Sequence, residues 1–346
     1  MVKATDEQPA ISFDISQLPW LSGSQQRLLD QIAQQRLPHA MLFTGTEGTG
    51  KSQLTHWLAH RLLCASPTSL GACGQCRSCL LVRAGSHPDF LNLQTEGASI
   101  GVDIVRKAIA TLSETAHQQG ARVVLIEHAE IMTEAAANAL LKTLEEPGQN
   151  AFLLLSAANA GQLVATITSR CQEHLVAVPN EQVALDWLAE QGSAATLAHL
   201  RLNGGAPLLA RSFVESGLHH QLDAFLVRLF AVLQGDSISN ELLADAVDDF
   251  PHSYHWLSSL LLDLQKVTLG LTPEHLMFSQ HWTELNALAQ QLHHQCPDWS
   301  PWLANWRQTL GAQGLNQNLQ WQAMLLSLQQ LLQQPNRPLI APNRSL

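Results

Sequence analysis

Charged side chains are scarce in this 346-residue chain, at 14% of all residues, against about a quarter in an average soluble protein. The 19 lysines and arginines are outnumbered by 29 acidic residues, and the formal net charge is −10. No run of basic residues is present, although a protein that follows a phosphate backbone needs clustered Lys and Arg. The composition therefore argues against DNA or RNA binding by this chain alone.

The sequence also lacks a stretch of about 18 apolar residues, which is the length that a helix needs to cross a bilayer. The N-terminal segment MVKATDEQPA does not have the positive and then apolar layout of a secretory signal. We therefore expect a cytoplasmic protein, whose cysteines are more often thiols or metal ligands than disulfides. Hydrophobic residues make up 46% of the chain, and its length predicts two or three domains.

Apolar runs that fit buried strands alternate with a helical pattern in the first half of the chain. The candidate strands are AMLFTG at 40–45, RVVLIEHAE at 122–130 and AFLLLSAAN at 151–159. Between the last two, the segment TEAAANALLKTLEEP predicts a helix that Thr133 caps and Pro147 ends. Such an alternation predicts an α/β domain whose parallel sheet is covered by helices on both faces.

Helical periodicity replaces the strand pattern after residue 178. The segment EQVALDWLAEQ predicts a short helix, and a Gly-Gly-Ala-Pro turn follows at 204–207. Beyond about residue 220 the pattern is helical almost throughout. We predict three domains: an α/β domain over 1–178, a small helical domain over 179–219 and an all-α domain over 220–346.

The stretch GTEGTGKSQL begins at Gly45 and has the spacing G-x-x-x-x-G-K-S of a phosphate-binding loop. Glycines such as Gly48 and Gly50 let backbone N–H groups converge on phosphate oxygens. In this motif Lys51 reaches the β and γ phosphates and the Ser52 hydroxyl binds magnesium. The predicted ligand is ATP with Mg²⁺, and the alternative is an ordinary glycine-rich turn.

Hydrolysis requires more than this loop, because one acidic residue must hold magnesium and another must orient the attacking water. The neighbouring strand ends in Glu127 and His128, where a hydrolase is expected to have Asp-Glu. Glu127 can support magnesium from a side chain one methylene longer, but His128 is a poor substitute for a carboxylate. One interpretation is an autonomous ATPase, a motor or chaperone that uses both residues. The other, which we favour, is a structural histidine.

Four of the cysteines lie close together in sequence, within the insertion 64–79. They are Cys64, Cys73, Cys76 and Cys79. Two C-x2-C spacings with no acidic ligand predict a closed, tetrahedral, structural zinc site. The alternatives are an iron–sulfur cluster and four cysteines without a ligand. A zinc-dependent nucleic-acid binder is a further hypothesis, which the negative charge disfavours.

Together these motifs resemble the AAA+ subunits of the bacterial DNA polymerase III clamp loader. The segments ANALLKTLEEP (137–147) and TSRC (168–171), and a cysteine cluster after the first helix of the loop motif, are similar to features that those subunits share. Three further segments resemble the delta-prime branch of the family. They are AGSHPDF (84–90), GVDIVRKAI (101–109) and GLNQNLQWQAMLLSL (314–328).

The resemblance implies an AAA+ P-loop domain, a helical lid domain and a C-terminal collar domain that joins subunits into a ring. The implied partners are the gamma/tau and delta subunits of a heteropentamer within the DNA polymerase III holoenzyme. Through them the chain would act on the sliding clamp and primed DNA. By the same resemblance, Arg170 is an arginine finger that completes the ATP site of a neighbouring gamma/tau subunit. The alternative is that Arg170 makes an ordinary surface ion pair.

Several positions depart from the ATP-hydrolysing members of the family. Besides His128, Ala157 and Ala158 stand where a polar sensor is expected, and Leu208 replaces the arginine of a Gly-x-x-Arg motif. The resemblance therefore implies a structural ring member whose own ATPase site is inactive. Glu145 and Glu146 lie at the C-terminal end of the helix that precedes Pro147, where the macrodipole disfavours negative charge. Such a charge marks either a site or a solvated helix end.

Overall fold

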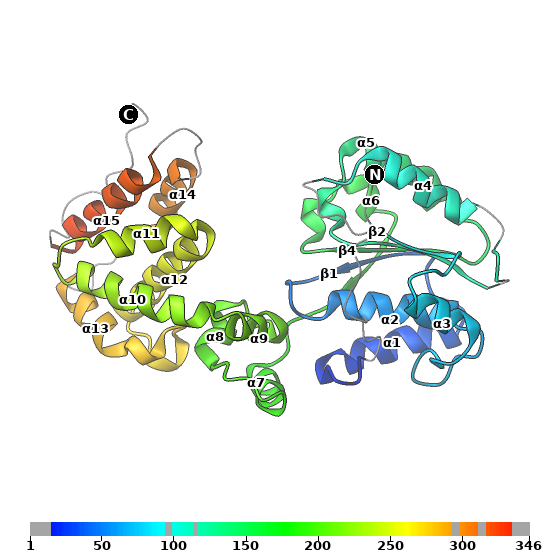
Figure 1. Ribbon diagram of the computed structural model, residues 1–346, viewed down its shortest axis with the longest axis horizontal. Helices are drawn as coiled ribbons and strands as arrows, with labels where there is room; N and C mark the ends of the chain where they lie inside the picture. The colour runs from blue at the N-terminus through cyan, green and yellow to red at the C-terminus, as the bar shows by residue number, and fades with distance from the viewer. Residues whose placement is uncertain are drawn as a thin grey trace. The chain divides into compact units, whose positions relative to one another are not determined.

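The computed structural model describes residues 15–93, 99–113, 116–118, 120–292, 298–310 and 316–333 (Figure 1). The chain divides into two compact units. The first comprises Met1–Trp187 with Ala206–Leu209, and the second comprises Leu188–Gly205 with Ala210–Leu346. The boundaries at 178 and 219, which the sequence suggests for three domains, stay predictions.

The first unit is built on a parallel sheet of five strands in the order β2-β3-β4-β1-β5. Three strands confirm the apolar runs: β1 (Ala40–Thr44), β3 (Arg122–Ile126) and β4 (Ala151–Ala157). The sequence did not indicate β2 (Phe90–Leu93) or β5 (Gln172–Leu175). Both are four residues long and lie at the sheet edges. Since β2 is only half-buried and β5 is mostly exposed, their apolar signal is weak.

Helices cover both faces of this sheet, with α4 and α5 on one face and α1 and α2 on the other (Figure 1). Every residue of β1 and β3 is buried, as expected for strands that are covered on both sides. The helices are α1 (Ser22–Ala33), α2 (Lys51–Leu63), α3 (Arg77–Arg83), α4 (Val102–Ser113), α5 (Glu134–Glu145), α6 (Ala165–Thr168) and α7 (Glu181–Glu190), with 3-10 turns η1 (Pro19–Leu21), η2 (Ala129–Ile131) and η3 (Ala160–Gln162). The predicted α/β class is confirmed.

The helix α5 has the start that the sequence predicted. The hydroxyl of Thr133 accepts a hydrogen bond from the backbone N–H of Ala136 at 3.2 Å, which satisfies one of the unpaired amides of the first turn. The helix ends at Glu145, before Pro147. It packs against the sheet through buried residues such as Leu140 and Leu144.

The second unit is helical throughout its described residues, as predicted. Its core is rich in aromatic side chains, including the fully buried Trp299, Trp321 and Phe225. The elements after residue 190 are α8 (Leu197–Leu202), α9 (Pro207–Glu215), α10 (Leu218–Leu233), α11 (Asn240–Asp248), α12 (Phe250–Thr268), η4 (Pro273–His275), η5 (Ser279–His281), α13 (Trp282–Gln291), α14 (Trp299–Leu310) and α15 (Gln317–Gln333). Among the described residues, no helix combines the length and apolar character that crossing a bilayer requires.

A buried carboxylate ties α12 to the segment that follows it. Asp263 is fully buried and accepts hydrogen bonds from Lys266 Nζ at 2.8 Å and from the backbone N–H of Phe278 at 2.8 Å. A buried charge is tolerated only when it is paired and hydrogen-bonded. Asp263 therefore fixes the path of the chain around the fully buried ring of Phe278.

We predict that Asp263→Ala destabilises the second unit by about 3 kcal/mol. The reason is that it leaves the buried backbone N–H of Phe278 without its acceptor and removes the carboxylate partner of Lys266, which, among the described residues, keeps only the carbonyl of His275. The change should lower the urea midpoint of the helical signal in circular dichroism. Asp248→Ala is the control, because Asp248 is exposed and its removal should shift the midpoint little. Equal midpoints for the two variants would contradict this role of Asp263.

Candidate functional site

The glycine-rich loop between β1 and α2 has a backbone that requires glycine. Gly45, Gly48 and Gly50 have φ angles of 139°, 73° and 91°, a region that side chains disfavour. A Cβ atom on Gly45 would lie 2.2 Å from the carbonyl oxygen of Val176, and one on Gly48 would lie 2.5 Å from Cγ of Leu209. Both the conformation and the close packing therefore exclude larger residues.

The loop presents unused donors. In the described part of the chain, the backbone N–H groups of residues 47, 48 and 50–52 have no hydrogen bond to a backbone carbonyl. The helix α2 begins at Lys51, so the positive end of its dipole lies at this loop. Lys51 Nζ donates to the carbonyl oxygens of Gly45 at 2.5 Å and Thr46 at 2.9 Å, which uses two of its three donors. Burial lowers the pKa of Lys51, while Glu47 and Glu130 act in the opposite direction. The loop is preorganised for an anion.

A cavity of about 250 Å³ lies over this loop. Its volume is just below the range of about 300 to 1,000 Å³ that is usual for small-molecule sites. It brings together every residue that the sequence suggested for nucleotide binding except Gly45, whose carbonyl oxygen holds Lys51. The lining residues are Glu47, Gly48, Gly50, Lys51, Ser52, Gln53, Glu127, His128, Ser156, Leu208 and Leu209.

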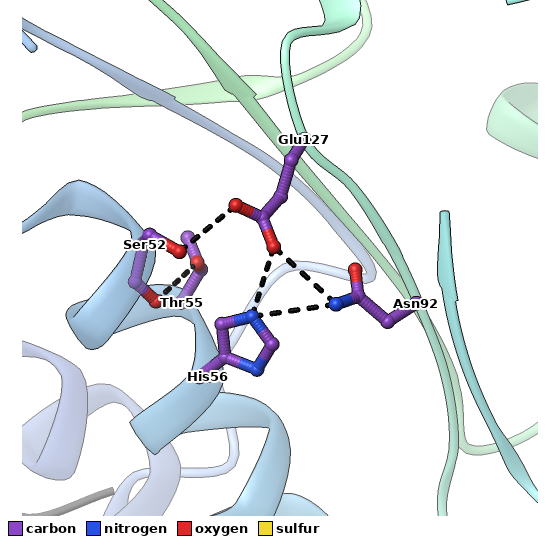
Figure 2. Close-up of polar contacts among 5 residues, drawn as sticks. All are labelled: Ser52, Thr55, His56, Asn92 and Glu127. Atoms are coloured by element: carbon purple, nitrogen blue, oxygen red, sulfur yellow. Dashed lines mark hydrogen bonds and ion pairs between the residues drawn. The ribbon is translucent and has the colours of Figure 1, made fainter. Parts of the chain in front are cut away.

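The carboxylate of Glu127 lies at the centre of a polar cluster (Figure 2). Ser52 Oγ donates to Glu127 Oε2 at 2.9 Å, and His56 Nε2 lies 2.9 Å from Glu127 Oε1. The side-chain amide of Asn92 donates to the same Oε1 at 3.3 Å. The side chains of His56 and Glu127 are only 3% and 11% exposed. Glu127 therefore reaches the loop hydroxyl in spite of its extra methylene.

Three residues of this site were missed by sequence reasoning. His56 follows Ser52 by one turn of α2, and that i, i+4 spacing is a signal that both share a helix face. Asn92 comes from β2, a strand that the sequence did not reveal. Ser156 lies in β4, is buried and lines the cavity, whereas the sequence drew attention to Ala157 and Ala158.

His128 and Leu208 differ in how they meet the cavity. His128 has a left-handed backbone with φ of 53°, its side chain is 62% exposed, and its Nδ1 lies 3.6 Å from Glu130 Oε1. It has no hydrogen bond to Glu127. The backbone N–H of Leu208 donates to the carbonyl of Gly48 at 3.2 Å. An apolar segment therefore packs on the loop at the position of the arginine in a Gly-x-x-Arg motif.

Arg170 does not line this cavity and follows the short helix α6. Its Nη2 and Nε lie 2.6 Å and 2.9 Å from Glu145 Oε1, and its Nη1 donates to the carbonyl of Thr166 at 3.1 Å. The side chains of Arg170 and Glu145 are 35% and 54% exposed. Within this chain, Arg170 thus forms a surface ion pair.

The four predicted metal ligands do come together. The sulfur atoms of Cys64, Cys73, Cys76 and Cys79 all lie within 4.8 Å of one another. The four contacts between them that satisfy hydrogen-bond distances range from 3.4 to 3.9 Å. Cys64 follows α2, and Cys76 caps the first turn of α3. Such a group of sulfurs can bind a metal ion.

Backbone amides favour the thiolate form of part of this cluster. The N–H groups of Cys73 and Cys76 donate to the sulfurs of Cys64 and Cys73, each at 3.3 Å. Burial alone raises the pKa of Cys76, but hydrogen bonds from the backbone of Cys79 and Ala65 and from neighbouring thiols lower it to about 6. Burial raises the pKa of Cys79. A cation among the sulfurs would favour the thiolate of all four.

Two segments of the chain match protein families. Residues 22–179 match the family described as DNA polymerase III, delta subunit, and residues 217–330 match the C-terminal region of DNA polymerase III delta subunit. A DNA polymerase III gamma subunit-related protein of Thermotoga maritima, whose structure is solved, is 17% identical, with 88% of this chain and 99% of that chain covered and a TM-score of 0.44. That structural likeness is loose.

Curated relatives are more similar. The chain is 38% identical over 262 residues to DNA polymerase III subunit delta' of Yersinia pestis, which covers 73% of this chain and 77% of the relative. It is 37% identical over 254 residues to DNA polymerase III subunit delta' of Escherichia coli K12, covering 72% and 76%. Given this identity over most of both chains, the chain belongs to the family of DNA polymerase III delta-prime subunits.

Proposed function

We propose that this chain is a structural member of the clamp-loader ring and that it supplies Arg170 in trans to the ATP site of a neighbouring gamma/tau subunit. The observation that carries the proposal is the position of Arg170, partly exposed and outside the chain's own cavity. The proposed partners are gamma/tau and delta subunits in a heteropentamer in the cytoplasm. Through that complex the chain contributes to loading the sliding clamp onto primed DNA.

The surroundings of Arg170 suit such a role. A guanidinium placed against a transferring phosphoryl group stabilises the charge that develops there. To do so, Arg170 must exchange its partner Glu145 for phosphate. A partly exposed ion pair contributes only about 0 to 1 kcal/mol. The exchange therefore costs little, and the free carboxylate of Glu145 regains water.

We propose further that the chain's own loop holds ATP with Mg²⁺ but does not turn it over. Phosphate oxygens suit the unused amides of the loop and Lys51. Hydrolysis would need a group that orients water, and His128 is largely exposed and is not joined to Glu127. This arrangement disfavours the alternative of an autonomous ATPase that uses Glu127 and His128.

We expect Arg170→Ala to lower the ATPase rate of the reconstituted clamp loader by at least about tenfold, since trans-acting arginines contribute about 10³ to 10⁵ in GTPases. The complex should still assemble, as checked by gel filtration. The measurement is steady-state ATP hydrolysis in the presence of clamp and primed DNA. Unchanged hydrolysis with Arg170→Ala would count against the finger.

Arg211 offers a matched control for this experiment. It is also a partly exposed arginine, at 38%, and its Nε lies 2.7 Å from Glu215 Oε1 within one helix. Arg211→Ala therefore removes a comparable surface ion pair with no expected effect on hydrolysis. A loss of equal size in both variants would indicate a general effect on the subunit rather than a role of Arg170.

We predict that the purified chain alone shows no steady ATP hydrolysis above a Lys51→Ala preparation. The reason is that His128 stands where a hydrolase has the carboxylate that orients the attacking water. The measurement is phosphate release at saturating ATP and Mg²⁺. Turnover by the wild-type chain that His128→Ala abolishes would favour the autonomous ATPase instead.

We also propose that the four cysteines hold a structural zinc ion. With Zn–S bonds of about 2.3 Å, tetrahedral geometry separates the sulfurs by about 3.8 Å. Four of the six sulfur pairs here lie 3.4 to 3.9 Å apart, and all six lie within 4.8 Å. Four sulfur ligands leave no position for water, so the ion would act in folding rather than in catalysis. Zinc binding can contribute on the order of 10 kcal/mol to local folding.

The expected zinc content is one ion per wild-type chain, measured by atomic emission. Cys76→Ser should lose the ion and expose the insertion 64–79 to proteolysis, because three remaining sulfurs bind more weakly. Cys171→Ser is the control, since that cysteine lies outside the cluster and its loss should leave zinc in place. Iron with visible absorption in place of zinc would support the iron–sulfur alternative.

A further inference from the structure

We propose that His56 and Asn92 are positioning residues, which hold the carboxylate of Glu127 against the Ser52 hydroxyl so that the loop takes up nucleotide together with a divalent cation. This inference rests on the nucleotide-holding role proposed above. It assigns a purpose to two polar side chains that neither the loop motif nor the finger function requires.

The starting point is the length of the Glu127 side chain. Compared with aspartate it has one more rotatable bond, and so it loses more conformational freedom when it is fixed in one geometry. It is also 11% exposed, and a buried carboxylate is stable only with hydrogen-bond donors around it. A glutamate can therefore serve at this position only if neighbouring groups fix its orientation.

The cluster supplies donors from two sides. Ser52 binds one carboxylate oxygen, while His56 and Asn92 both contact the other. Ser52 and His56 belong to α2, whereas Asn92 belongs to β2, which pairs with β3 directly before Glu127. The ring of His56 is also packed edge-on against Phe90, with centroids 6.4 Å apart and planes at 82°. Helix and sheet together restrict the carboxylate (Figure 2).

The arrangement favours a cation site over simple core packing. Ser52 and Glu127 both line the cavity, beside Lys51 and the unused backbone amides. A hydroxyl and a carboxylate are the oxygen ligands that Mg²⁺ prefers, directly or through water. His56 and Asn92 contact Glu127 without lining the cavity. They are thus placed to orient a ligand rather than to bind the cation, as outer partners do at metal sites.

The test is a titration of Mg²⁺ into the full chain saturated with a fluorescent ADP analogue, repeated with Mn²⁺ detected by electron paramagnetic resonance. His56→Ala and Asn92→Ala should each raise the Kd for the cation by about 10- to 100-fold, the usual effect of losing an outer partner. Their affinity for the nucleotide in EDTA should stay unchanged. His56→Gln, which keeps an N–H donor, should restore part of the cation affinity.

His275→Ala is the control, because it removes a 57% exposed imidazole whose Nε2 lies 3.6 Å from Glu274 Oε1 and which does not line the cavity. It should alter neither affinity. If His56→Ala does not fold, Asn92→Ala carries the test, since Asn92 is only half-buried on a short edge strand.

Two outcomes would overturn the inference by itself: an unchanged Kd for the cation in both variants, or an equal loss of nucleotide affinity with and without Mg²⁺, which would indicate a structural role. A third outcome is different. If the wild-type chain shows no saturable binding at millimolar nucleotide, or Lys51→Ala binds as well as wild type, the nucleotide-holding role itself fails and the inference fails with it.

Discussion

The parallel pairing of β4 with both β1 and β3 is the constraint on which the candidate site depends. It aligns Thr44 with Ala157 and Ile126 with Leu155, so the carboxyl ends of these strands meet at one edge of the sheet. That alignment brings three groups to this edge: the glycine-rich loop, Glu127 and the hydroxyl of Ser156. Ligands of open α/β sheets bind outside this edge, and the cavity of this chain lies there.

Features that are local in sequence could be predicted from it. The runs that became β1, β3 and β4 are apolar because both faces of each strand are covered, and the loop and the cysteine cluster depend on fixed spacings. In contrast, β5 pairs with β1 through its backbone and is mostly exposed. Since backbone pairing requires no apolar side chain, its sequence QEHL carried no strand signal.

The polar partners of Glu127 and Arg170 depend on contacts between distant segments. The helical spacing of Ser52 and His56 was visible in the sequence. The contact of Asn92 with Glu127, in contrast, can be inferred only when β2 is known to pair with β3. Glu145 and Glu146 stood out because their charges oppose the helix macrodipole. The structure provides a partner for Glu145, since Arg170 lies 2.6 Å away and offsets that charge. The unfavourable charge at the helix end thus indicated that a contact exists, but the sequence did not identify Arg170 as the partner.

Glu127 and Arg170, two charged groups of the first unit, differ in burial. A buried carboxylate is stable only when hydrogen-bond donors surround it, so Glu127, with donors from both α2 and β2, is confined to one geometry. A partly exposed pair contributes about 0 to 1 kcal/mol, so Arg170 can leave Glu145 at little cost. The first arrangement suits a fixed binding site, because its geometry should change little when a ligand enters. The weak pair of Arg170 with Glu145 suits a side chain that must bind a ligand of a neighbouring subunit, because little free energy is lost when it leaves Glu145.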